Sequence, residues 1–169
     1  MEKIKQNLDK IIKVLSIVAM ALFIPSIFGY LDDNISTTNV GPIIYMTRLV
    51  LLVGAAGILL LIECKKCDKY SLLPIILLSS ANLLSYGYSL ISSSNIDFAL
   101  LPNVALYVAI IVLALLKAKG GNILNAYLIL LLIAVAFAFA SAIGGGSTSL
   151  GLFIILTLIL LKEYFKERE

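Results

Sequence analysis

The sequence contains no histidine and no tryptophan, and only 14% of its 169 residues are charged. Without histidine, the chain lacks the one side chain that ordinarily exchanges protons near neutral pH, and it cannot hold a haem through an imidazole. A soluble domain has about 25% charged and about 45–50% apolar residues, whereas 61% of this chain is hydrophobic. A water-soluble core of this size cannot bury that excess. The composition therefore predicts a protein that is surrounded by lipid.

Long hydrophobic runs account for most of the chain. A helix needs about 20 predominantly apolar residues to cross a bilayer. The runs are continuous, which is typical of spanning helices, and they do not alternate as the strands of a membrane barrel would. The connectors are too short to hold a soluble domain, so residues 1–169 are expected to form one transmembrane domain. We predict an all-α bundle of six transmembrane helices at 11–30, 43–62, 71–91, 98–117, 123–143 and 149–165.

The basic residues predict the orientation of these helices. Twelve of the thirteen lie near the two chain ends and in the connectors after the second and fourth spans, and Arg48 is the exception. Short loops rich in Lys and Arg stay in the cytoplasm. We therefore expect a multi-pass protein of the cell membrane with both termini in the cytoplasm. Because the basic groups flank spans and are mixed with acids, they form no patch of the kind that binds nucleic acid.

The third span carries a row of polar side chains that recur at steps of three or four residues, which places them on one side of a helix. Asn82 falls near the middle of the bilayer, where an amide needs hydrogen-bond partners. The row should therefore face the bundle, either as contacts between helices or as the lining of a polar pathway. No acid accompanies it, which speaks against cation binding or proton relay. Its members are Ser79, Asn82, Tyr86, Ser89 and Ser93.

Arg48 is the one charge well inside an apolar span. It lies about one and a half turns, or about 8 Å, beyond Ile43 at the outer end of the second span. A charge at this depth is costly and often functional, although arginine can also extend its side chain toward the surface. We expect Arg48 to extend outward or pair with an acid of the outer connectors, and a contact with an anion or substrate is the alternative. Those acids are Asp32, Asp33 and Asp97.

Cys64 and Cys67 form a Cys-X-X-Cys pair at the end of the second span. Such pairs can be redox active or can supply half of a zinc site. A structural zinc ion needs four ligands, and this chain has no further Cys and no His. We therefore expect no metal and no cofactor, and we favour an unreactive pair. A reactive dithiol and a zinc site shared between two chains remain alternatives.

Small residues mark two surfaces for close helix packing. Gly54 and Gly57 flank two alanines in the second span, and Ala134, Ala138 and Ala142 recur every four residues in the fifth. Small side chains let helix backbones approach closely in membranes. These surfaces should pack within the chain or against a partner.

The functional prediction follows from these observations. The acids are scattered and no chemical site is recognisable, so we expect no enzyme activity and no catalytic residues. We favour a non-catalytic accessory or assembly subunit of a larger membrane complex, in contact with the lipid bilayer and with other membrane subunits or further copies of itself. The alternative is a small transporter or channel whose polar pathway follows the third span.

Overall fold

The computed structural model describes residues 2–33, 40–65, 70–92 and 98–166, and these residues are almost entirely helical and contain no strand. Six of the helices are long and apolar enough to cross a membrane, which confirms the predicted all-α transmembrane bundle. A 3-10 turn, η2, at Phe98–Leu100 leads into the fourth of them. The six are α1 (Glu2–Asp33), α2 (Val40–Lys65), α3 (Leu73–Ser92), α4 (Leu101–Ala118), α5 (Leu124–Gly144) and α6 (Ser147–Lys166).

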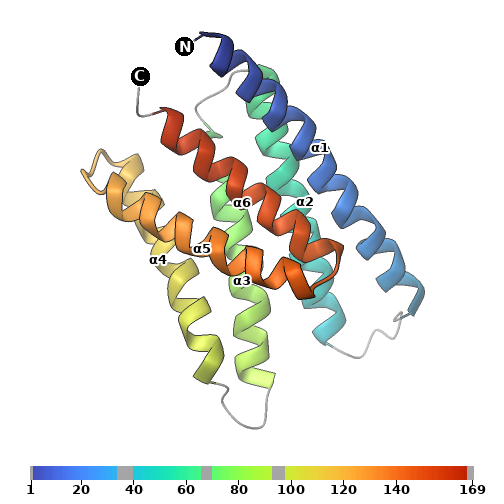
Figure 1. The fold of residues 1–169 in the computed structure, drawn as a ribbon. Coiled ribbons are helices and arrows are strands. Elements are labelled where there is room, and N and C mark those ends of the chain that lie inside the picture. Colours follow the sequence, from blue (N-terminus) through green and yellow to red (C-terminus); the bar gives the residue numbers. More distant parts are fainter. Residues whose placement is uncertain (1, 34–39, 66–69, 93–97, 167–169) are drawn as a thin grey trace.

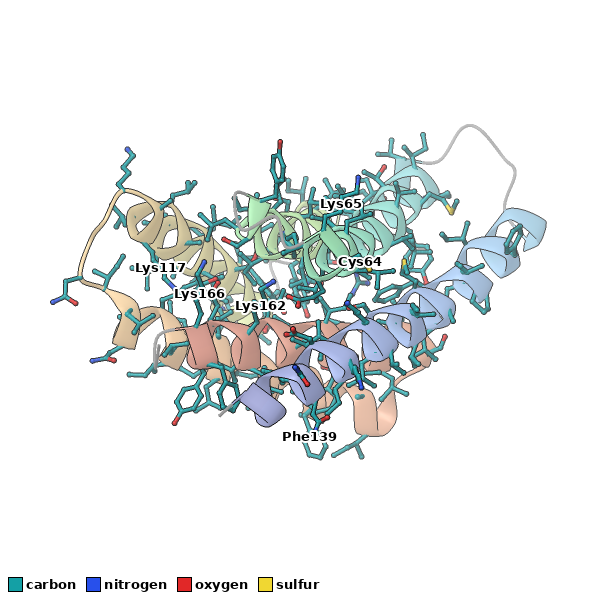
Figure 2. The ribbon with its side chains drawn as sticks, turned by 90° about the horizontal axis from the view of Figure 1, so that it is seen from above. Cys64, Lys65, Lys117, Phe139, Lys162 and Lys166 are labelled. Carbon is teal, nitrogen blue, oxygen red and sulfur yellow. The ribbon has the colours of Figure 1, made fainter. Side chains whose placement is uncertain are left out.

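The six helices form a closed arrangement. Each packs against the next along the chain, and α6 also packs against α1. α1 begins and α6 ends at the same end of the bundle, the upper end in Figure 1, where the turn between α4 and α5 also lies. Viewed from that end, one layer contains α2, α3 and α4, and the other contains α1, α6 and α5 (Figure 2). The chain alternates between the two ends, as the charge pattern requires.

Large apolar side chains cover the outside of the bundle. Exposed isoleucine, leucine, valine or phenylalanine residues occur on all six helices, and in no spanning segment are more than 39% of the residues buried. Soluble proteins rarely expose an apolar surface of this extent to water. The same side chains are well solvated by lipid tails, so this surface indicates that the bundle contacts a bilayer.

The small-residue surfaces pack against other helices of the same chain. Ala55 and Ala56 of α2 are fully buried, and so is Ala134 of α5. A Cβ atom on Gly54 would lie 3.8 Å from Leu77 of α3, and one on Gly57 would lie 3.8 Å from Met20 of α1. These positions therefore bring neighbouring helices of one bundle together.

Two tight turns fix how α4, α5 and α6 meet. Gly120 follows the end of α4 with a φ of +84°, a conformation that favours glycine. Its N–H bonds to the Lys117 carbonyl, and the Gly121 N–H bonds to the Leu116 carbonyl, which closes the last turn of the helix. Between α5 and α6, a Cβ atom on Gly145 would come within 2.4 Å of the Ser141 carbonyl oxygen. Glycine therefore permits this abrupt reversal.

Candidate functional site

A polar contact joins α2 to α3 within the bundle. The Arg48 guanidinium donates through Nη2 to Oδ1 of Asn82 at 3.5 Å, which is long for a hydrogen bond. Asn82 is fully buried, and it lies near the middle of α3. Arg48 lies eight residues after the start of α2, or about 12 Å along the helix. Both residues are candidates predicted from the sequence, and the structure shows that they contact one another.

Three polar groups at this contact are buried and have no hydrogen-bond partner among the described residues. An arginine only donates hydrogen bonds, so the amide oxygen of Asn82 must face the guanidinium and the Nδ2 amide group must face away from it. That Nδ2 group is buried and unpaired, as are Nε of Arg48 and Oγ of Ser79, one turn before Asn82 on α3. These three groups define what we call the Arg48 cluster.

The other members of the predicted polar row lie farther along α3. The Tyr86 ring stacks on the buried Tyr107 of α4, with ring centroids 6.1 Å apart. Ser89 is exposed, and its hydroxyl donates to the Ser85 carbonyl of its own helix at 3.0 Å. Ser93 lies outside the described residues. Asn82 and Tyr86 therefore contact neighbouring helices, Ser79 is buried, and the Ser89 side chain is exposed.

The predicted acid partners of Arg48 lie where the structure describes no side chain. Within the described residues, no carboxylate lies within ion-pairing distance of its guanidinium. Asp97 and the side chains of Asp32 and Asp33 lie outside the described part of the chain. Arg48 therefore carries a positive charge that the described interior does not balance.

A second polar group lies at the other end of the same helices, and the sequence analysis missed it. Lys162 of α6 pairs with Glu63 of α2, and the next residue, Glu163, pairs with Lys117 of α4. All four side chains are largely buried, and the Glu163 carboxylate is only 6% exposed. Figure 2 shows Lys117 and Lys162 near that end of the bundle. We call these four residues the ion-pair cluster.

The ion-pair cluster also involves α5. The Lys117 ammonium lies 5.4 Å from the centre of the Tyr127 ring, close enough for a cation–π interaction. The Tyr127 ring is fully buried, and its hydroxyl has no hydrogen-bond partner within the described ranges. Through Lys117 and Glu163, the charges of α4 and α6 are thus held against α5. This cluster fixes four helices relative to one another.

A sequence signal for the ion-pair cluster does exist. The four residues occupy the last turns of α2, α4 and α6, at the ends of long apolar runs, and all three helices end on the same side. Both signs of charge are therefore present at one level of the membrane. We treated the lysines as orientation anchors and the acids as scattered because sequence does not show which helices are neighbours.

Buried apolar side chains occupy the middle of α4. On this helix, the fully buried Ile110 and Ala114 lie between Tyr107 and Lys117. Leu59 of α2, Leu78 of α3, and Ile155 and Leu156 of α6 are also at most 1% exposed. The interior of α4 is therefore apolar between Tyr107 and Lys117, whereas α1 carries a further buried polar residue, Ser16, whose hydroxyl has no partner among the described residues.

The cysteine pair is only half described. Cys64 is exposed and is a free thiol near the end of α2 (Figure 2), and Cys67 lies outside the described residues. In the described ranges, no three His, Cys, Asp or Glu side chains gather in a way that could hold a metal ion.

Comparison with protein-family models, with curated proteins and with solved structures gives no match for this chain.

Proposed function

We propose that the protein is a small, non-catalytic membrane transporter or channel, with the buried polar side chains of α3 and Arg48 forming part of its pathway. The observation that carries this proposal is the Arg48 cluster, a charge inside the membrane with unpaired polar groups around it. Ionisable groups within spanning helices are expensive to maintain and usually mark solute pathways or binding sites.

The packing of the small residues favours a transporter or channel over an accessory subunit. An accessory subunit would use surfaces of this kind to bind its partners, but Ala55, Ala56 and Ala134 are buried within the bundle. On α4 the fully buried Ile110 and Ala114 lie between Tyr107 and Lys117, so we expect that passage of a solute would require the helices to move apart.

Replacing Asn82 with leucine should abolish solute passage, because it removes the amide that contacts Arg48 at the centre of α3. The purified chain would be reconstituted into liposomes, and light scattering would follow volume changes after exposure to neutral, cationic and anionic solutes. Ser26→Ala is the matched control, since Ser26 contacts Thr148 between α1 and α6, away from α3. The proposal fails if the wild-type chain passes no solute, or if Asn82→Leu passes solutes as fast as the wild type.

An accessory subunit is the second candidate, and the outer surface of α5 favours it. Phe137 and Phe139 are both more than half exposed. The Phe139 ring packs against Phe153 of α6, with ring centroids 5.4 Å apart. Figure 2 places Phe139 on the outer side of its layer, away from α2, α3 and α4. Aromatic side chains on such a surface can pack against another membrane protein. Extraction in mild detergent should then recover stoichiometric partners, a result that would weigh against the transporter.

We also propose that the chain lies in the cell membrane with the α1 start and the α6 end in the cytoplasm. A membrane-impermeant thiol reagent added to intact cells should then fail to label Cys64, and it should label the protein once the cells are opened. An Ile91→Cys variant tests the opposite end, because Ile91 is 87% exposed near the end of α3. It should be labelled from outside in a background that lacks the native cysteines. Labelling of Cys64 in intact cells would contradict this orientation and indicate the opposite one.

A further inference from the structure

We propose that the Arg48 cluster, formed by Arg48, Asn82 and Ser79, binds a small inorganic monoanion such as chloride or nitrate. The inference names the solute class for the pathway of the proposed function and depends on that function for its physiological role. Binding itself can be measured without any transport.

The first argument is that the cluster has donors in excess. Nε of Arg48 and Nδ2 of Asn82 carry N–H groups and have no lone pair to accept with, and both are buried and unpaired. The amide oxygen of Asn82, which could have accepted a bond from a ligand, already faces Arg48. The hydroxyl of Ser79 can donate as well as accept. A ligand that satisfies these groups must therefore be an acceptor.

The second argument is charge. An arginine remains protonated under all ordinary conditions, and the described interior offers Arg48 no carboxylate. A monoanion would neutralise the guanidinium and accept its unpaired N–H group at the same time. A neutral acceptor would accept the N–H group but would leave the guanidinium charge without a counter-charge.

The third argument is depth. Arg48 lies about four and a half residues from the midpoint of α2, or about 7 Å along the helix. The hydrocarbon core extends about 15 Å on either side of its centre. The cluster therefore lies well below the level of lipid phosphates. A compact soluble anion fits this position better than the headgroup of an anionic lipid.

The experiment measures the thermal unfolding midpoint of the full chain in a neutral detergent. Sodium gluconate would be replaced stepwise by sodium chloride or sodium nitrate at constant ionic strength. A ligand that binds the folded state raises the midpoint, so we expect a saturable increase of about 3 °C or more at high occupancy. No increase, or one that grows linearly without saturation, would overturn the site.

Variants assign the effect to the cluster. Asn82→Asp places a carboxylate beside Arg48, so it should abolish the anion response while keeping the midpoint in gluconate at or above that of the wild type. Arg48→Met should also lose the response, and Ser26→Ala should keep it. If Asn82→Asp responds as the wild type does, the anion binds elsewhere. Adding phosphatidylglycerol tests the lipid source, and stabilisation by this lipid but by neither salt would overturn the proposal.

Binding and passage can fail separately. A saturable anion response with no passage of any solute would contradict the proposed transport and leave the binding site standing. Passage of solutes that Asn82→Leu blocks, without any anion response, would contradict the site and leave the proposed transport standing.

Discussion

Replacing Glu163 with glutamine is expected to destabilise the bundle by about 3 kcal/mol or more. The carboxylate is only 6% exposed and pairs with Lys117 of α4. The substitution keeps the shape of the side chain and removes its charge, so the Lys117 ammonium keeps its burial and loses the carboxylate of Glu163. Taking one charge from a buried ion pair is far more costly than losing a surface pair. Equilibrium unfolding by a denaturing detergent, in mixed micelles, measures the change.

Two control variants separate the ion pair from a general loss of charge. Lys119→Gln removes an exposed lysine at the end of the same helix and should change the free energy of unfolding by about 0.5 kcal/mol or less. The double variant Lys117→Met with Glu163→Leu replaces the pair with apolar side chains and should recover most of the loss. The interpretation is wrong if Glu163→Gln is no more disruptive than Lys119→Gln.

Replacing Gly151 with leucine should destabilise the protein by about 3 kcal/mol, at the upper end of what overpacking normally costs. Gly151 is buried in α6 where this helix meets α1. Even a Cβ atom there would lie 2.8 Å from two ring atoms of Phe23, which is itself fully buried. The larger leucine side chain would have to displace this buried ring, so we expect α1 and α6 to separate. Thermal unfolding of the purified chain measures the effect.

Gly87 provides the matched control for that experiment. It also lies within a spanning helix, but a Cβ atom there would meet nothing within 4 Å. Gly87→Ala should therefore be neutral or slightly stabilising, because alanine has the better helix propensity. The combination of Gly151→Leu with Phe23→Ala should recover part of the lost stability. If Gly151→Leu unfolds at the wild-type temperature, α1 and α6 do not pack as closely as described here.

The positions of the helices could be predicted from sequence because a bilayer imposes a single length on each apolar run. The predicted span 123–143 became α5 at Leu124–Gly144, and 149–165 became α6 at Ser147–Lys166. The helix that contains the first predicted span, 11–30, extends beyond it at both ends. α1 begins at Glu2 and ends at Asp33, since a helix can continue past the hydrocarbon where its side chains are polar.

The neighbours of each helix could not be predicted in the same way. The sequence shows Arg48 and Asn82 as two polar residues in different spans. Only the packing of α2 on α3 brings Nη2 of Arg48 to 3.5 Å from Oδ1 of Asn82. The ion-pair cluster was missed for the same reason, because Lys162 and Glu163 are adjacent in sequence but contact different helices. Lipid is equally favourable for every apolar face, so hydrophobicity does not specify which faces meet.

The position of Lys162 and Glu163 in α6 has a consequence for biosynthesis. During translation, Glu63 and Lys117 enter the membrane before the helix that carries their counter-charges has been made. A nascent chain released after α5 would hold an acid and a base at the bilayer edge without those partners. Such truncated products should be recognised and degraded by membrane quality-control proteases, whereas chains that complete the last helix would escape.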